Sequence, residues 1–460
     1  FRDLRGFCGL GEDSDPADLV LHLIQHFRHG LAFGNVDNDI PDAGSREAGN
    51  LLDAFQALKP LLEALADPDP AQRRVAVDVL GHLGNRNAAG PLLALAEGDA
   101  PVELRIRALE GVGRLKDPEV AARLAALATG SERRLREVAA WALAQVHGAR
   151  SEPALRTLLA QGDPGVRAHA AIGLGASADP RVADMLEAAV QNERSPAVQA
   201  AAAWSLGEVG DDAAVPLLVS ALRGAPPLVA RASALALGAL ATQGATAGRE
   251  ALVEALFDPR PELRRAAADG LRGAAPVVTV ASPVGISIDA YLERALKSAS
   301  GPSTPVDLGP LLPALESAAH AALRGPMERV DAALDLLAAP ASGVSPLGLG
   351  PLTEGMEAWP ESARDEALTA TTALFRALVP DLLSLAEHPA PAIRAETLAR
   401  LGAAAAADAP AVAAVLAGAL GDPDDDVRRA ALEAVDARHA GAPALENAVA
   451  EATRARDWAS

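Results

Sequence analysis

The sequence is poor in the residues that carry most protein chemistry. Cys8 is the single cysteine in 460 residues, which excludes an internal disulfide and any metal site that needs several cysteine ligands. Aromatic residues make up only 3% of the chain, so a core must be built mainly from alanine, leucine and valine. Small side chains let helices approach closely, and alanine has the highest helix propensity. This composition favours packed helices over strands.

Positive charge is also scarce. The formal net charge is −20 and no basic segment is concentrated enough to contact a phosphate backbone, which argues against nucleic acid as a partner. We expect a neutral or basic protein partner. The most apolar long stretch, residues 401–421, is interrupted by Asp408 and Pro410, which argues against a membrane span.

The sequence constrains the cellular compartment only through its cysteine and its first residue. One free cysteine is compatible with a reducing compartment, and we expect the protein in the cytoplasm. The chain opens on Phe1 rather than on methionine, so the removal of a targeting segment stays open.

A short phrase recurs along the chain, and over seven of its copies the interval is 31 to 34 residues. It consists of an apolar residue, then usually an arginine, then small or apolar residues three and seven places later. With the second position as anchor, the copies lie at Arg73, Arg105, Arg136, Arg167, Gln199, Ala230, Arg264, Arg394 and Arg428. A repeat of this length predicts two short helices, which can bury their apolar faces only by stacking on neighbouring repeats. The sequence therefore predicts an all-α fold, an α-solenoid of stacked helical hairpins.

The regularity of the phrase divides the chain into four segments. Residues 1–46 are expected to form a divergent N-terminal cap, and residues 47–274 a regular array. Residues 275–378 lack the phrase, so we expect degenerate repeats that stay helical and continue the same superhelix, with residues 277–288 as a non-helical loop or extended insertion. Regular repeats return over residues 379–460 and end in a tail.

Two phrases carry a resemblance to a known family, DPGVRAHAAIGLG at residues 163–175 and SPAVQAAAAWSLGEVGD at residues 195–211. They resemble the HEAT-repeat superfamily, and especially its short alanine-rich repeats of the phycobilisome-lyase type. Repeats of this kind serve as scaffolds, inhibitors, adaptors and, less often, enzymes. The resemblance therefore implies a fold and a surface for binding, and it does not imply a reaction.

The anchor arginine recurs together with an aspartate several residues before it, as in Asp67 and Arg73 or Asp422 and Arg428. One interpretation is a charged track that binds a ligand. The other is a structural ladder in which the arginine holds neighbouring units together, as the HEAT resemblance implies. Opposite charges that recur together mostly satisfy one another and nearby helix ends, so we expect the ladder.

Three histidines are the sharpest candidate for chemistry. His22, His26 and His29 are spaced by four and three residues, which places them on one face of a helix in a geometry that suits a shared metal. The zinc-protease motif requires a glutamate between its two histidines, and no glutamate lies between His22 and His26. The neighbouring apolar residues are typical of an ordinary amphipathic cap. We therefore expect no metal and no other cofactor.

Other catalytic patterns are missing from the sequence. None of the nine histidines is followed by glutamate, whereas deoxyhypusine hydroxylase, which is similar in fold, depends on such dipeptides as iron ligands. The sequence holds no glycine-rich phosphate loop and no nucleophile elbow. Catalysis stays open as an alternative, but the better prediction is a protein that is not an enzyme.

We predict a non-catalytic scaffold or adaptor that binds a protein partner through the concave face of the solenoid, which the second helices line. Residues one, four and five places after an anchor are expected on this face. The predicted contacts are Arg74, Asp78, Glu110, Glu137, Trp141, Trp204 and Arg231. The acidic members fall in consecutive repeats, which favours a basic segment of the partner.

Some alternatives remain open at this point. Trp141 and Trp204 occupy equivalent positions, where they either grip a peptide or pack in the core, and we expect packing. The resemblance to phycobilisome-lyase repeats implies a second function, a chromophore- or cofactor-lyase accessory protein. A third is a metal-dependent enzyme that uses the N-terminal histidine cluster.

Overall fold

The described part of the chain consists of helices joined by turns and short loops. The computed structural model describes residues 58–59, 61–146, 148–177, 179–210, 212–273, 285–299, 305–338, 349–354, 356–403 and 409–435. These residues form α-helices and short 3-10 helices, and no strand occurs among them. The predicted all-α solenoid class is confirmed.

The chain divides into two compact units. Unit 1 comprises residues 1–209 and 279–293, and unit 2 comprises residues 210–278 and 294–460. This division differs from the four segments expected from the sequence, because those segments follow the regularity of the repeat and not the compactness of the fold.

Unit 1 is a stack of helical hairpins. Its helices are α4 (Pro70–His82), α5 (Ala89–Glu97), α6 (Val102–Leu115), α7 (Ala121–Ala128), α8 (Arg133–Gln145), α9 (Glu152–Gln161), α10 (Pro164–Leu174), α11 (Pro180–Asn192) and α12 (Pro196–Val209). Each first helix, α5, α7, α9 or α11, packs on the second helix that follows it. The second helices also pack on one another along the array.

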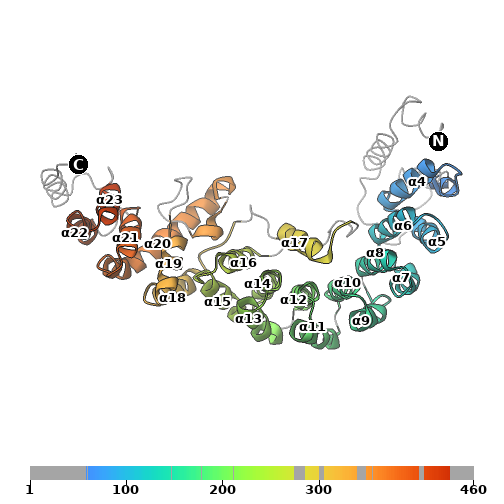
Figure 1. The fold of residues 1–460 in the computed structure, drawn as a ribbon, viewed down its shortest axis with the longest axis horizontal. Helices are drawn as coiled ribbons and strands as arrows, with labels where there is room; N and C mark the ends of the chain where they lie inside the picture. Colours follow the sequence, from blue (N-terminus) through green and yellow to red (C-terminus); the bar gives the residue numbers. More distant parts are fainter. Residues whose placement is uncertain are drawn as a thin grey trace, which may run out of the picture. The chain divides into compact units, whose positions relative to one another are not determined.

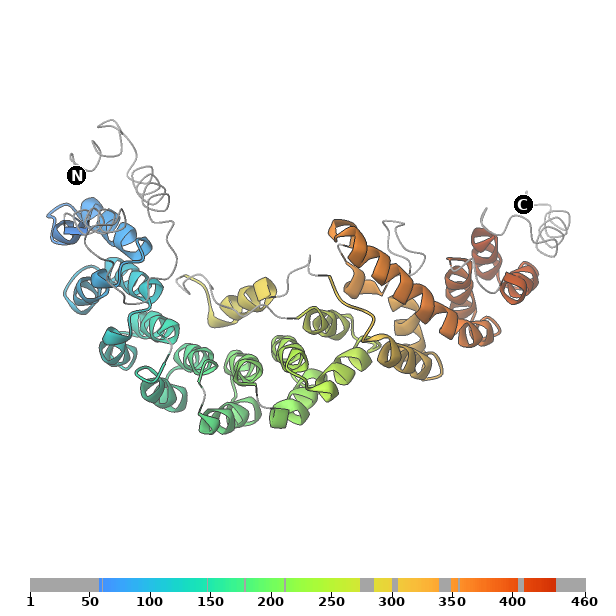
Figure 2. The same ribbon diagram turned by 180° about the vertical axis from the view of Figure 1, so that it is seen from behind.

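The second helices of unit 1 form a continuous row from α4 to α12. Figure 1 shows this row on the inner side of the curve that unit 1 makes, with the first helices on the outer side. Figure 2 shows both rows from behind. We call the surface that α4, α6, α8, α10 and α12 present on the inner side the second-helix face.

Aspartate–proline pairs set where helices begin. Asp69 caps α4 by accepting a hydrogen bond from the backbone N–H of Ala71 at 2.9 Å. Pro70 fits the first turn, where a backbone N–H has no partner within the helix. Asp179 caps α11 in the same way, through the N–H of Arg181 at 2.9 Å. The recurrent pair is thus a start signal for helices of both rows.

Glycine allows the second helices to approach closely. A Cβ atom on Gly81 of α4 would lie 2.7 Å from the Cα atom of Gly111 in α6. A Cβ atom on Gly113 would lie 2.5 Å from Cζ3 of Trp141, so the indole of α8 packs directly on the glycine backbone of α6. Larger residues at either glycine would separate the helices.

Several anchor arginines link one repeat to the next. Arg105 donates a hydrogen bond to Glu132 Oε2 at 2.7 Å. Arg136 donates to Asp163 Oδ2 at 2.5 Å and to the carbonyl oxygen of Gly130 at 3.1 Å. The predicted structural ladder is therefore confirmed. Its acidic partner comes from the following repeat, and not from the aspartate just before the arginine.

Unit 2 begins with the same hairpins and then becomes irregular. Its elements are α13 (Val215–Gly224), α14 (Pro227–Thr242), α15 (Thr246–Ala255), α16 (Pro261–Leu271), α18 (Leu312–Leu323), α19 (Met327–Leu336), η4 (Gly350–Thr353), η5 (Met356–Ala358), α20 (Glu361–Leu385), α21 (Pro391–Ala403), α22 (Ala409–Ala419) and α23 (Asp425–Ala434). Helix α18 packs on α15 and η4 packs on α16. Within unit 2 the array therefore passes from α15 and α16 to α18 and α19.

Helix α17 (Ile288–Ala299) stands apart from this array. Residues 279–293 belong to unit 1, so the first half of α17 lies with the regular repeats of that unit. Of the predicted non-helical residues 277–288, the described residues 285–287 are non-helical, Ile288 begins α17, and residues 277–284 lie outside the described residues.

Helix α20 is longer than the sequence suggested. The sequence pattern predicts a helix over residues 361–378, with regular repeats from residue 379, but α20 continues through Pro380 to Leu385. Proline removes a helical hydrogen bond and usually ends a helix. Here the helix packs on α18 and α21, which outweighs that cost. By length and composition α20 is the one described helix that could cross a membrane, and 44% of its most apolar stretch is buried within the protein.

Candidate functional site

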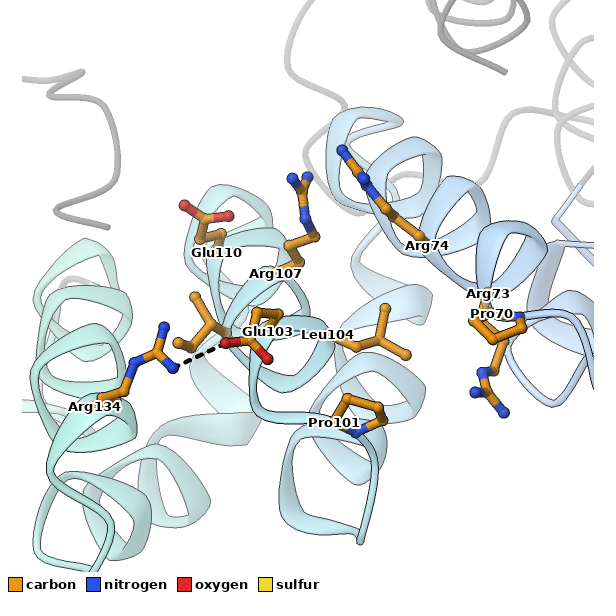
Figure 3. Close-up of a pocket in the computed structure, with 10 residues that line it drawn as sticks. Pro70, Arg73, Arg74, Pro101, Glu103, Leu104, Arg107, Glu110 and Arg134 are labelled. Atoms are coloured by element: carbon orange, nitrogen blue, oxygen red, sulfur yellow. Dashed lines mark hydrogen bonds and ion pairs between the residues drawn. The ribbon is translucent and has the colours of Figure 1, made fainter. Parts of the chain in front are cut away.

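A pocket opens on the second-helix face of unit 1. Its volume is about 590 Å³, and residues of α4, α6 and α8 line it. The buried side chains of Leu104 and Ile106 form its apolar part. Its charged lining residues are Arg73, Arg74, Arg107, Arg134, Glu103 and Glu110. Figure 3 shows Arg74, Arg107 and Glu110 pointing to the same side.

Two ion pairs cross between neighbouring second helices at this pocket. Arg107 Nη1 donates to Asp78 Oδ1 at 3.0 Å, which joins α6 to α4. Arg134 Nη1 donates to Glu103 Oε1 at 2.9 Å, which joins α8 to α6 (Figure 3). The hydrogen bond from Arg134 lowers the pKa of the Glu103 carboxyl below its ordinary value. Two acidic side chains of the face are thus engaged within the protein.

Arg74 and Glu110 are the charges of the pocket that a ligand can reach most directly. Arg74 is exposed and Glu110 is half-buried, and neither has an ion-pair partner among the described residues. They are opposite in sign. The face expected to be acidic is therefore mixed in charge here, because arginines of the following repeats lie beside its carboxylates.

A second site lies further along the same face. His169 of α10 is 1% exposed, and its ring meets that of Tyr291 of α17 edge to face, with centroids 4.9 Å apart and planes at 73°. Glu137 Oε1 of α8 lies 4.0 Å from His169 Nε2. Neither ring nitrogen of His169 has a hydrogen-bond partner in the described part of the chain. Burial lowers the pKa of His169 to about 3, so the ring is neutral at pH 7.

Tyr291 is the only tyrosine of the chain, and it is 2% exposed. Burial raises the pKa of its phenol above the ordinary value. The indole of Trp141 lies beside the hydroxyl and opposes part of that rise, although Trp141 Nε1 makes no aligned hydrogen bond. We call Trp141 and His169, which lie beside this ring, together with Glu137, which lies beside His169, the Tyr291 site.

The structure separates the predicted contact residues into two groups on unit 1. Arg74 and Glu110 line the pocket, and Asp78 pairs with one of its arginines. Glu137 and Trp141 belong to the Tyr291 site. Burial raises the pKa of Glu137, against the effect of the nearby Arg133, and 38% of its side chain remains exposed.

The remaining two predicted residues lie elsewhere. Trp204 of α12 is 6% exposed and packs in the core, as expected of these tryptophans. Arg231 belongs to α14 of unit 2, where it donates to Asp269 Oδ2 at 2.8 Å. Neither side chain lies at the pocket or at the Tyr291 site.

Sequence reasoning missed a buried charge cluster in unit 2. Asp269 and Arg272 are 5% and 8% exposed, and a pocket of about 530 Å³ is lined by Asp269 and Arg231. Burial raises the pKa of Asp269 although both arginines oppose the rise, and burial lowers the pKa of Arg272. The available signal was the place of Asp269 five residues after the Arg264 anchor, where Trp141 and Trp204 stand in their repeats.

Sequence also missed Tyr291 and His169. Tyr291 lies outside the repeat register, and His169 lies inside an ordinary repeat helix. The signal that could have found them is the single tyrosine in an aromatic-poor chain, placed on the apolar face of an amphipathic helix.

The predicted metal candidates His22, His26 and His29 lie outside the described residues, as does Cys8. Within the described ranges, no group of three or more histidine, cysteine, aspartate or glutamate side chains could hold a metal ion. The described pockets are lined by ion pairs and apolar residues, and none of these linings assembles a nucleophile with a general base.

Comparison with known proteins identifies the repeat. The family of HEAT repeats matches residues 58–144, 124–195 and 152–238, so this part of the chain consists of HEAT repeats. No curated protein matches the chain.

Solved structures resemble the chain in fold alone. Human deoxyhypusine hydroxylase in complex with glycerol is 19% identical, over 55% of this chain and 96% of that one, with a TM-score of 0.25. The complex of CpcE and CpcF of phycocyanin lyase from Nostoc is 20% identical, over 58% and 99%, with a TM-score of 0.34. The karyopherin Kap121p bound to Pho4p is 15% identical, over 98% and 59%, with a TM-score of 0.40. None of these likenesses carries an argument about function.

Proposed function

We propose that this HEAT-repeat protein is a non-catalytic scaffold or adaptor that binds another protein through the second-helix face of unit 1. The observation that carries the proposal is the pocket of about 590 Å³, which extends over α4, α6 and α8. Protein interfaces combine an apolar centre with a polar rim. Leu104 and Ile106 supply such a centre, and Arg74 and Glu110 supply rim charges.

The partner segment is expected to carry charges of both signs. A basic residue fits Glu110, which is the part of the predicted acidic face that has no ion-pair partner among the described residues. An acidic residue fits Arg74. A wholly basic segment would meet Arg107 and Arg134 as well, and like charges at an interface are repulsive.

Charge reversal at the two rim residues tests the proposal. A partner is captured from the source cells, purified, and titrated against the full chain by calorimetry. Glu110→Lys and Arg74→Glu should each weaken binding by roughly threefold to tenfold, because an exposed charge pair contributes at most about 1 kcal/mol. Arg376→Glu, at an exposed position of α20 in unit 2, is the matched control and should leave the affinity unchanged.

Two outcomes would contradict the proposal. If both reversals left the affinity and its salt dependence unchanged, the interface would lie away from this pocket. If the purified chain carried a coloured ligand with visible absorption, the alternative of a chromophore- or cofactor-lyase accessory protein would replace the scaffold.

A further inference from the structure

We infer that the first half of α17, residues 288–293, is an internal occupant of a helix-binding site on the second-helix face of unit 1. The partner that takes its place presents an amphipathic helix with a tyrosine or tryptophan at the position of Tyr291. This inference rests on the proposed function, because it specifies what the face binds. Its starting point is that residues 279–293 interrupt unit 2 in the sequence and yet belong to unit 1.

Helix α17 has the pattern of a peptide that lies in a groove. Its buried residues are Tyr291, Leu292, Ala295 and Leu296, each at most 3% exposed. Its exposed residues include Asp289, Glu293, Arg294 and Lys297. Spacings of one, four and five residues place the buried set on one face of the helix. Amphipathic helices of this kind bind hydrophobic grooves through a few anchor side chains.

Among the described residues, no extended helix–helix interface holds α17 to unit 1. The second helices of unit 1 pack closely on one another, and none of them packs as extensively on α17. Tyr291 is the aromatic anchor of α17, since its ring meets His169 and lies beside Trp141, and the adjacent Leu292 is also buried. A segment anchored in this way can leave without breaking a long helix–helix interface. A partner helix that binds the Tyr291 site with ordinary affinity can therefore displace α17.

The Tyr291 site is shaped by the repeats themselves. The ring of Trp141 is fixed against Gly113, where an added Cβ would lie 2.5 Å from the indole. Glu137 packs against Gly165 at the start of α10, where an added Cβ would lie 2.6 Å from Oε1. The packing of α8 on α6 thus places the aromatic wall of the site.

The site also contains an unsatisfied acceptor. His169 is neutral and almost fully buried, and both its ring nitrogens lack a hydrogen-bond partner among the described residues. A neutral imidazole offers one acceptor nitrogen. The Tyr291 hydroxyl lies beside the Trp141 indole and leaves that nitrogen without a donor. A partner side chain whose O–H or N–H group reaches His169 gains a hydrogen bond that α17 does not make. This chemistry favours tyrosine or tryptophan over phenylalanine in the partner.

A peptide of residues 285–299 tests whether the site accepts a helix from outside. In the full chain with Tyr291→Ala, the internal anchor is removed. The fluorescently labelled peptide should bind this variant at least tenfold more tightly than it binds the wild-type chain, whose own α17 competes. The same peptide with Tyr291→Ala should not bind. The peptide with Glu293→Ala, changed on the exposed face, should bind like the unchanged peptide.

The single tyrosine gives a readout that needs no substitution. Chain labelled with 3-fluorotyrosine has one fluorine position, at Tyr291, and so shows one ¹⁹F resonance. Excess unlabelled peptide should replace the resonance of the buried ring by that of a solvent-exposed tyrosine. The purified partner should cause the same change.

The outcomes distinguish this inference from the proposed function. If the peptide bound both chains equally, or failed to bind the Tyr291→Ala chain and failed to shift the ¹⁹F resonance, α17 would be a fixed part of the fold and the inference would be wrong. A partner that binds without moving the resonance would leave the scaffold proposal standing and would also overturn the inference. If the peptide displaced α17 but no protein partner were found, the helix-binding site would stand and the scaffold proposal would be wrong.

Discussion

In both units an anchor arginine pairs with an acidic residue of the next stacked repeat, but the sequence separation between the two residues differs. In unit 1, Arg136 reaches Asp163, which lies 27 residues further on. In unit 2, Arg264 reaches Asp335, 71 residues further on, at 2.5 Å. Asp335 lies at the end of α19, so α18 and α19 take the place of the next repeat. The acidic partner of an anchor arginine is thus the residue that the stacking brings next to it, at whatever distance in the sequence. A long insertion that includes α17 therefore separates the two partners in the sequence of unit 2.

The two units also differ in what they bury. In unit 2, Arg272 donates to the carbonyl oxygen of Pro351, and Arg400 donates to that of Leu334 at 2.9 Å. These arginines bind the main chain of the irregular segment, whose carbonyl groups would otherwise lack partners. Unit 1 instead buries the neutral ring of His169. Both units use arginines between stacked repeats, and in unit 2 arginines also hold the main chain of the irregular segment.

The largest expected effect comes from breaking the buried charge cluster of unit 2. Asp269→Ala leaves Arg231 and Arg272 without their shared carboxylate. Removal of one member of a buried pair costs about 3–5 kcal/mol, because the remaining charge stays buried without compensation. Urea unfolding followed by circular dichroism measures the loss. Glu262→Ala, at an exposed position of the same helix, is the control, and an equal effect of both variants would contradict the structural role of the cluster.

A smaller effect is expected from the packing of unit 1. Gly113→Ala places a Cβ 2.5 Å from the ring of Trp141, and overpacking of this kind costs about 1–3 kcal/mol. Gly90→Ala adds the same methyl group to α5, where no atom lies within 4 Å. That variant should be more stable than the wild type by about 0.5–1 kcal/mol, because alanine favours the helix. Thermal unfolding of the two variants should therefore shift in opposite directions.

The repeat made most of the fold predictable from sequence. Helix α6 spans Val102–Leu115 around the Arg105 anchor, and the small or apolar residues three and seven places later, Ala108 and Val112, are buried as the phrase predicts. Helix α20 was underestimated because a proline normally ends a helix, and only its packing on α18 and α21 explains its continuation.

The candidate site was predictable only in part. The periodicity placed Arg74 and Glu110 on one face, since both count from an anchor. It could not show that Arg107 pairs with Asp78, because that contact depends on the offset between stacked helices. It also could not bring Tyr291 to His169, since α17 lies outside the register and its position depends on tertiary contacts alone.

A fall in pH should lower the free energy of unfolding of unit 1, because the buried His169 ring is neutral in the folded chain. Its folded pKa is about 3, whereas an unfolded histidine titrates near its ordinary value of 6.5. The stability contributed by the neutral ring is therefore fully present above pH 6.5 and is lost as pH falls below it, because the unfolded chain takes up the proton first. The loss reaches about 2 kcal/mol at pH 5.

Unfolding between pH 7.5 and 5.5 measures this slope. Glu137 offsets part of the loss at lower pH, since burial raises its pKa and the folded chain takes up that proton first. His169→Leu should flatten the slope, and His82→Gln, at an exposed residue of α4, should leave it unchanged. The ¹⁹F resonance of Tyr291 over the same range shows whether α17 leaves its site. A slope that survives His169→Leu would assign the effect to other groups.

The smallest effect is expected at the pair between Asp78 and Arg107, which lies at 24% and 37% exposure on the second-helix face. A double-mutant cycle of Asp78→Asn and Arg107→Gln should give a coupling below about 1 kcal/mol, because solvent screens the pair. The cycle also decides the role of Asp78, which the sequence placed among the partner contacts. If Asp78 acts within the protein, Asp78→Asn should change partner affinity less than Glu110→Lys does. The opposite order would make Asp78 a direct contact of the partner, with Arg107 only holding it in place.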